Sequence, residues 1–377
     1  MTGVQKVWGV AKKSPSPSSE SDPSGIPPKE EHPVSVIISF GILLFLVFAF
    51  KQSVLDANNI PSGSMIPTLK VGDYLFVNRM RYSFRLPFLG TEVIHIDEPQ
   101  RGDIITFIPR EEPDKNYVKR VIGMPGDRIR IRNLNLCNPE IPVERVANPE
   151  YTCDETENLD RYRSPDIAYV EYRPADSGEW KHFTYRELGP EESRAILEDS
   201  DSTSVLHPEV VPGIQTDVPV VLEENIEGKK HYIVERYHYM GADIAPSMCP
   251  AISTTGCVLE PNRYFVMGDN RDDSKDSRFT GVGPIERSTI LGKALIIYFS
   301  IDWRDRICHD FDASMAGGIG IHAFKLKDFT VDDQIAHCSP IDRMQDAETL
   351  WQYLVRTVLY RIPRMDVRWS RLGQILH

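Results

Sequence analysis

The sequence has little of what marks a nucleic-acid-binding protein or a helical bundle. Acidic residues outnumber basic ones by 55 to 43, and the formal net charge is −12. Proteins that bind nucleic acid usually carry a basic footprint, so this balance argues against a nucleic-acid partner. Helical periodicity is scarce, whereas 28 prolines and 24 glycines interrupt the chain. Such residues favour turns and short strands, and the predicted fold class is therefore mainly β.

Motifs of histidine-based hydrolases and of ordinary zinc sites are also missing. No Gly-x-Ser-x-Gly elbow occurs, and no histidine stands in a recognisable triad context. No Cys-x-x-Cys pair occurs either, although Cys308-His309 and His337-Cys338 form a mirrored pair that could hold zinc. An oxidising compartment would favour a disulfide there instead. We predict no metal and no cofactor.

The six cysteines leave their pairing open. An even number is compatible with three disulfides, for which neighbour pairing is the simplest pattern, and equally with six unlinked thiols. The cysteines are Cys137, Cys153, Cys249, Cys257, Cys308 and Cys338.

Only one stretch is long and apolar enough to cross a membrane. Residues 34–50, VSVIISFGILLFLVFAF, carry no charge and barely cover a hydrocarbon core of about 30 Å. We predict a single transmembrane helix over 33–50, after a disordered cytoplasmic tail over 1–32 that is rich in serine and proline. A cleavable signal peptide and a buried core helix are the alternatives. Lysines flank the run equally, so their count does not set its orientation.

Beyond Lys51 the pattern is typical of strands. Short runs rich in β-branched and aromatic residues end at Gly, Pro, Asp or Asn. Helices are predicted only over 190–199 and near 346–358. The predicted strands are 73–80, 102–109, 127–133, 230–239, 262–270 and 293–300.

A stiff loop carries the first candidate for chemistry. In IPSGSMIPTL, over 60–69, Ser64 follows Gly63 and lies between Pro61 and Pro67. The glycine permits close backbone approach, and the prolines stiffen the loop. The loop could fix a hydroxyl for nucleophilic attack, although a surface turn has the same composition. A serine nucleophile also needs a base.

Two later stretches could complete such a site. In NYVKRVIGMPGD, over 116–127, Lys119 lies inside an apolar strand. An inward orientation would lower the lysine pKa from about 10.4 toward neutrality, so the amine could take the Ser64 proton; a solvated edge lysine is the alternative. In GDNRDDSKDSRFTGVGP, over 268–284, alternating Asp and Arg could fix a loop through charge-assisted hydrogen bonds. There Ser274 could hold the lysine amine.

In this order after an apolar segment, the three stretches resemble type I signal peptidases, or leader peptidases. GDYLFVNR, RGDIITF and RWSRLGQIL also match, and the likeness covers 51–127, 262–303 and about 366–376, roughly half the chain. The resemblance implies a membrane-bound serine endopeptidase. Such an enzyme removes N-terminal signal peptides from exported preproteins after a small-x-small (Ala-x-Ala) site.

The resemblance also implies an organisation in domains. An antiparallel β catalytic domain would combine 51–127 with 262–303 and 361–377. A variable second β domain would be inserted at 128–261. The segment 304–360 would be an insertion of unknown role.

Carried over residue by residue, the resemblance makes Ser64 the nucleophile and neutral Lys119 the general base. The Ser62 hydroxyl would join the Ser64 N–H in an oxyanion hole, and Ser274 would orient the lysine. The residues expected to support the site are Asp269, Arg271, Asp276 and Arg278. The apolar walls of the substrate cleft would be Ile60, Pro61, Met65, Leu69, Tyr117 and Val118.

The implied location is the bacterial cytoplasmic (inner) membrane, with the catalytic domain on the periplasmic side. The implied partners are the signal peptides of exported preproteins, membrane lipid and, functionally, the export machinery. An inactive membrane-anchored β scaffold that binds exported chains is the main alternative. A self-cleaving regulator of the same Ser–Lys class fits less well, because the chain has a membrane span and no DNA-binding module. A mitochondrial-type processing peptidase is a narrower variant.

Overall fold

The computed structural model describes residues 33–145, 166–198, 220–235, 251–279, 281–302 and 366–376, with a few positions between 349 and 362. Structural statements below concern these residues. Contacts divide the chain into two units, Met1–Val47 and Phe48–His377, and each is described by itself. The predicted tail over 1–32 lies outside the described residues, as does most of the segment 304–360 with its helix near 346–358.

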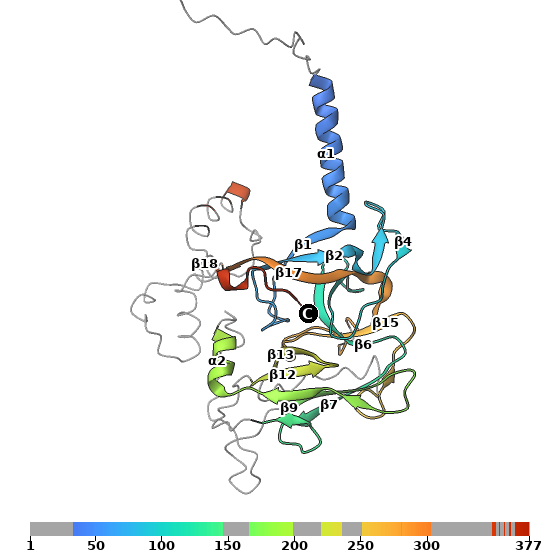
Figure 1. The fold of residues 1–377 in the computed structure, drawn as a ribbon, viewed down its shortest axis with the longest axis vertical. Coiled ribbons are helices and arrows are strands. Elements are labelled where there is room, and N and C mark those ends of the chain that lie inside the picture. The colour runs from blue at the N-terminus through green and yellow to red at the C-terminus, as the bar shows by residue number, and fades with distance from the viewer. Residues whose placement is uncertain are drawn as a thin grey trace, which may run out of the picture. The chain divides into compact units, whose positions relative to one another are not determined.

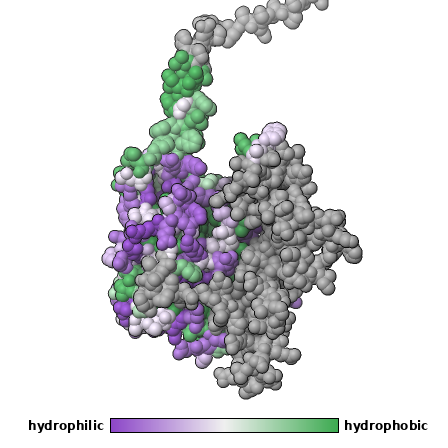
Figure 2. All heavy atoms as spheres, turned by 180° about the vertical axis from the view of Figure 1, so that it is seen from behind, coloured by the Kyte–Doolittle hydropathy of each residue, from purple (hydrophilic) through white to green (hydrophobic). Residues whose placement is uncertain are grey.

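The apolar run forms the helix α1 (Pro33–Ser53). The large side chains from Val34 to Phe50 are exposed in this structure, and Figure 2 shows them as a continuous apolar surface along the helix. By length and composition α1 could cross a membrane. The helix predicted over 33–50 is confirmed, and it continues through Lys51 to Ser53.

An eight-stranded antiparallel sheet forms the centre of the β unit. Seven strands follow the order β1-β2-β17-β5-β6-β15-β16, and β18 pairs with β17. Strands far apart in the sequence are therefore neighbours, as Figure 1 shows for β2 and β17. The strands are β1 (Leu55–Asn59), β2 (Asp73–Asn78), β5 (Ile104–Phe107), β6 (Tyr117–Gly123), β15 (Arg263–Met267), β16 (Ile285–Glu286), β17 (Ile290–Asp302) and β18 (Asp366–Val367).

Two four-stranded sheets come from the chain between β6 and β15. Their orders are β10-β9-β7-β14 and β13-β12-β11-β8. Their strands are β7 (Arg128–Asn135), β8 (Val143–Glu144), β9 (Asp166–Arg173), β10 (Lys181–His182), β11 (Thr184–Glu187), β12 (Val220–Ile226), β13 (Lys229–Glu235) and β14 (Cys257–Val258). All three sheets belong to the unit Phe48–His377, and a domain division at 128–261 stays a prediction.

Two smaller elements complete the described fold. The helix α2 (Pro190–Glu198) begins with proline and has two acidic residues in its first turn, which suits the positive end of the helix dipole. The hairpin of β3 (Ser83–Arg85) and β4 (Glu92–His95) exposes apolar side chains. These are Leu86, Phe88, Leu89, Val93 and Ile94.

Burial on both faces distinguishes β6 from a strand that borders solvent. Its last five residues, Lys119 to Gly123, are all buried. Val121 belongs to one apolar cluster and Ile122 to another. A charged side chain on this strand is therefore removed from water. On a strand with alternating apolar and polar residues, one face usually borders solvent and such a side chain would stay hydrated.

Most of the sequence-based fold prediction is confirmed. The six predicted strands correspond to β2, β5, β7, β13, β15 and β17, and the helix over 190–199 is α2. Cys137 and Cys257 are in disulfides, so for these two the unlinked alternative is wrong. The other four cysteines, and with them the possible zinc pair, lie outside the described residues.

Candidate active site

The Ser64 loop is fixed at both ends by backbone hydrogen bonds. The Ile60 N–H donates to the Asp73 carbonyl at 2.8 Å, and the Leu69 N–H donates to the Met65 carbonyl at 2.9 Å. Ile60, Met65 and Leu69 are buried in one apolar cluster. The short Pro- and Gly-containing stretch is therefore anchored by its apolar residues and leaves Ser64 at the edge of a cleft.

A second clamp on this loop comes from the far end of the chain. Arg371, in a short 3-10 turn (Trp369–Arg371), donates to the Thr68 carbonyl at 2.9 Å. The same guanidinium binds the Asp73 carboxylate through contacts of 3.0 and 2.5 Å. Both partners are buried, so the C-terminal RWSRLGQIL stretch supports the Ser64 loop directly.

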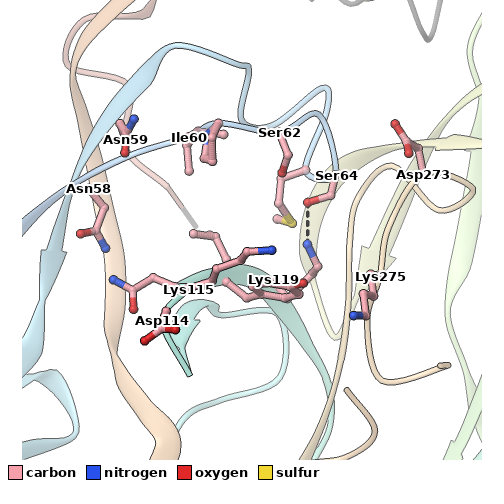
Figure 3. A pocket seen from close by; sticks show the side chains of 15 residues that line it. Asn58, Asn59, Ile60, Ser62, Ser64, Asp114, Lys115, Lys119, Asp273 and Lys275 are labelled. Atoms are coloured by element: carbon pink, nitrogen blue, oxygen red, sulfur yellow. Dashed lines mark hydrogen bonds between the residues drawn. The ribbon is translucent and has the colours of Figure 1, made fainter. Parts of the chain in front are cut away.

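Lys119 points into the protein and meets the serine. Its Nζ lies 2.5 Å from Ser64 Oγ, and Figure 3 shows the two side chains pointing toward one another across the cleft floor. The side chain comes from β6 and the residue is 3% exposed. Burial lowers the pKa of the Lys119 amine to about 8, although Asp276 and Asp269 act in the opposite direction. The inward orientation is confirmed, and the solvated-edge alternative is wrong.

The chemical consequence is an amine that could act as a base without histidine. With a pKa of about 8, roughly a tenth of the Lys119 amine is neutral at pH 7. A neutral amine accepts a hydrogen bond from a hydroxyl and can take its proton. The pair can therefore generate a serine nucleophile.

The loop 268–278 packs against the backbone of Ser64. The Asn270 N–H donates to the Ser64 carbonyl at 3.2 Å, and the Asn270 side-chain amide donates to the Gly63 carbonyl at 3.1 Å. A Cβ at Gly268 would lie 2.3 Å from Ser274 Oγ and 2.4 Å from the Ser64 carbonyl oxygen. Only glycine fits there, because any side chain would push the two loops apart.

Asp269 is held by a residue that sequence reasoning did not select. Arg120, next to Lys119 on β6, donates to both carboxylate oxygens at 2.9 and 2.7 Å, and the Thr68 hydroxyl donates at 2.5 Å. Burial alone would raise the Asp269 pKa, but Arg120 lowers it to about 2. The carboxylate is therefore charged and fixed close to the Lys119–Ser64 pair.

The other predicted support residues are buried in the same loop. Arg278 binds Asp276 through two contacts of 2.9 Å and also donates to the Arg271 carbonyl. The Gly268 N–H donates to Asp276 at 2.9 Å. These charge-assisted bonds link residues within the loop. Asp269, Asp276 and Arg278 act on the Lys119 amine, whereas the Arg271 side chain binds Glu224 and the Gly268 carbonyl.

The two auxiliary serines differ in their surroundings. Ser62 is exposed and lines the cleft, so its hydroxyl can reach a bound ligand. Ser274 is buried and packs at Gly268 beside the Ser64 backbone. Among the hydrogen bonds of the described residues, none joins Ser274 to Lys119. The roles of both serines stay predictions.

The cleft itself has a volume of about 530 Å³. The predicted wall residues Ile60, Pro61, Met65, Tyr117 and Val118 line it. Leu69 does not belong to this lining and is buried in the core. Polar residues that the sequence did not single out also line it: Asn58, Asn59, Asp114, Lys115, Asn116, Asp273 and Lys275 (Figure 3). No sequence signal singled these residues out, because both neighbours Asn58 and Asn59 line the cleft and Asp273 and Lys275 lie in a loop without a side-chain period.

The described residues offer no competing metal chemistry at this place. Within these ranges, no group of three or more His, Cys, Asp or Glu side chains could hold a metal ion.

A family model identifies the family to which the chain belongs, and known sequences are similar to it. The family described as "Signal peptidase, peptidase S26" matches residues 34–201 and 219–299, well over half of the chain. A signal peptidase I of Pseudomonas aeruginosa is 28% identical over 76% of this chain and 79% of its own length. One of Buchnera aphidicola subsp. Acyrthosiphon pisum is 28% identical over 71% and 75%. A crystal structure of a signal peptidase I from Enterococcus faecalis V583 is 17% identical and covers 52% of this chain and 97% of its own, with a TM-score of 0.22.

Proposed function

Because the chain belongs to the signal peptidase family, peptidase S26, we propose that it removes signal peptides with Ser64 as nucleophile and neutral Lys119 as general base. The observation that carries this mechanism is the 2.5 Å contact between Ser64 Oγ and Lys119 Nζ. The lysine amine is buried and its pKa is about 8. A charged surface lysine could not take a serine proton, whereas this one can.

The reaction follows from the positions of these groups. The Lys119 amine takes the Ser64 proton as Oγ attacks the scissile carbonyl carbon. The oxyanion that forms accepts hydrogen bonds from the Ser64 N–H and the Ser62 hydroxyl. The Lys119 ammonium then gives its proton to the departing amine of the mature protein. A water molecule, deprotonated by Lys119, hydrolyses the acyl-enzyme, which releases the signal peptide carboxylate and restores Ser64.

The cleft explains the proposed preference for small side chains. The strand β1 is at the edge of its sheet, and Asn58 and Asn59 on it line the cleft. An extended substrate that adds to this edge would place alternate side chains toward the apolar wall formed by Ile60, Met65 and Val118. We propose that only alanine-sized residues fit at the two alternate positions before the cleaved bond.

The same proposal includes the location of the enzyme. The α1 helix ends at Ser53, only eleven positions before Ser64. A signal peptide emerges at a membrane surface, so a nucleophile close in sequence to an anchor suits this substrate. We place α1 in the bacterial cytoplasmic membrane, the β unit on the periplasmic side, and the chain in contact with lipid and in functional association with the export machinery.

The direct test is cleavage of a preprotein with an Ala-x-Ala site by the full-length protein in detergent. We expect one cut after the second alanine, identified by mass spectrometry of both products. A matched preprotein with phenylalanine in place of that alanine should be cleaved at least 100-fold more slowly, if the apolar wall admits only alanine-sized side chains as proposed. Binding of the preprotein without cleavage, in several lipid conditions, would support the scaffold alternative instead.

The pH dependence of kcat/KM should reflect the pKa of the Lys119 amine. Since only the neutral amine acts as base, kcat/KM should fall about tenfold per pH unit below about 8 and level off above it. The measurement is kcat/KM for the Ala-x-Ala preprotein between pH 6 and 9.5. An inflection near 6.5, the ordinary pKa of histidine, would contradict Lys119 as the base.

A further inference from the structure

The hairpin of β12 and β13 forms backbone hydrogen bonds with the loop 268–278, which contacts Ser64. The Val234 N–H of β13 donates to the Asp269 carbonyl at 2.9 Å, and the Arg271 N–H donates to the Val234 carbonyl at 2.9 Å. Val234 and Asn270 thereby form a parallel bridge. The loop 268–278 is therefore attached to the edge of β13 by backbone hydrogen bonds. The β12–β13 hairpin itself carries none of the predicted catalytic residues.

A buried ion pair joins the same two elements through side chains. Glu224 of β12 accepts a hydrogen bond from Arg271, and both side chains are fully buried. Burial alone would raise the Glu224 pKa, but Arg271 lowers it to about 2. Arg271 also donates to the Gly268 carbonyl at 3.2 Å. The guanidinium thus links the carboxylate of β12 to the residue that packs on the Ser64 carbonyl.

His231 of β13 fills the space between two carboxylates. Its Nε2 lies 3.1 Å from Glu224 and 3.8 Å from Asp269. Burial and the nearby Arg120 lower the His231 pKa, so the ring is neutral at neutral pH. The neutral ring adds no charge to the paired cluster of Glu224–Arg271 and Asp269–Arg120.

Glu235 on β13 also acts on the Arg271 guanidinium, but less strongly than Glu224 does. Burial raises the pKa of Glu235 well above its usual range, so Glu224 is the main carboxylate that balances Arg271. Without the Glu224 charge, Arg271 would be left buried and unbalanced, and it would leave its position or draw in water.

The far end of the hairpin is fixed to the eight-stranded sheet. In its turn, Lys229 donates to the Arg101 carbonyl at 2.8 Å and to Asp103 at 3.2 Å. Arg101 also binds Glu227 at 3.2 Å. Glu224 lies two residues before the end of β12 and pairs with His231. The Glu224–Arg271 contact is therefore close to this fixed end and transmits its position to the loop.

We infer that Glu224 and His231 are positioning residues of the cleavage reaction, which set the loop 268–278 against the Ser64 backbone. The inference rests on the proposed function. Neither residue touches the cleft lining, so both act through Arg271 and Asp269. Of the loop 268–278, only Asp273 and Lys275 line the cleft. Loosening the loop should therefore slow the chemical step more than it weakens substrate binding.

The loop also surrounds the lysine, which gives a second readout. Asp269, Asp273, Asp276 and Arg278 face Lys119, but burial is the largest influence on its pKa. Water that enters beside a loosened loop would therefore raise the lysine pKa. The acidic limb of the kcat/KM profile should move to higher pH.

The test compares Glu224→Gln with Glu223→Gln in the full-length protein. Glu223 is the adjacent carboxylate on β12 and binds Lys230 at 2.9 Å and Arg186 at 3.2 Å instead. We expect E224Q to lower kcat at least tenfold with KM within twofold, and to move the acidic limb up by half a pH unit or more. E223Q should keep the wild-type kcat, KM and pH profile.

Several outcomes would overturn the inference. The first is an unchanged kcat in folded E224Q. The second is a lower kcat/KM at every pH with an unchanged pH profile, because this result means only that fewer molecules are folded. If E224Q does not fold, His231→Gln takes its place and is judged by the same criteria, because this variant keeps the Glu224–Arg271 pair. If neither variant folds, the two residues have a role in folding alone, and the inference is wrong. Full activity of Ser64→Ala would instead refute the proposed function, whatever the Glu224 result.

Discussion

Replacing Ser64 with alanine is expected to lower kcat for the Ala-x-Ala preprotein by a factor on the order of 10⁴ or more. The reason is that the side chain supplies the attacking oxygen, and no acyl-enzyme forms without it. The variant should still fold, since Ser64 Oγ has the Lys119 amine as its hydrogen-bond partner and the loop is held mainly by backbone bonds and by Ile60, Met65 and Leu69. The measurement is quantitative gel analysis over long incubations.

Ser177→Ala is the matched control for this experiment. Ser177 is in the turn after β9, where its hydroxyl accepts from the Glu179 N–H at 3.2 Å, and it does not line the cleft. Its removal should leave kcat and KM unchanged. Residual activity of Ser64→Ala above about one hundredth of wild type would mean that another group is the nucleophile.

Lys119→Met should abolish cleavage to a similar extent and, at the same time, stabilise the fold. The folded-state pKa of about 8 lies below the usual 10.5, so between these values the unfolded state binds more protons. Stability from this group therefore rises with pH through that window, and at pH 7 the buried lysine costs about 3 kcal/mol. Methionine has a similar shape and needs no proton, so the variant should gain about that much in free energy of unfolding.

Urea denaturation of the full-length protein in detergent measures this gain. It should be present at pH 7 and nearly absent above pH 10.5, where wild-type lysine is neutral in both states. Lys181→Met on the short strand β10, where the residue is exposed, should change neither stability nor activity. Equal stability of Lys119→Met and wild type at pH 7 would contradict a pKa lowered by burial.

Local patterns predicted the helix α1, six of the strands and the residues that form the Ser64–Lys119 contact. Local patterns did not decide whether Lys119 faces inward, because its orientation depends on distant segments that cover both faces of β6. They also paired acids and bases within the loop, as is correct for Asp276 and Arg278. The partner of Asp269, however, is Arg120, which is 149 positions away.

Leu69 shows a related limit of sequence reasoning. Its motif is shared by cleft residues, yet its side chain turns into the core. Glu224 and His231 lie in a stretch with no recognised motif. The pairing of Val234 with Asn270 and the Glu224–Arg271 ion pair bring them to the site. Contacts of this kind arise from tertiary packing, which neither periodicity nor turn chemistry encodes.

The contacts of Arg371 with Asp73 and Thr68 determine when the Ser64 loop can complete its folding during synthesis. Residues 73 and 371 are 298 positions apart. The strand β2 likewise pairs with β17, which is synthesised much later. A ribosome adds about 5–20 residues per second, so tens of seconds pass between synthesis of the nucleophile loop and synthesis of its last clamp. During that interval the serine exists but its loop is incompletely held. We therefore expect a protease that folds in this order to stay inactive while its own chain is still being made.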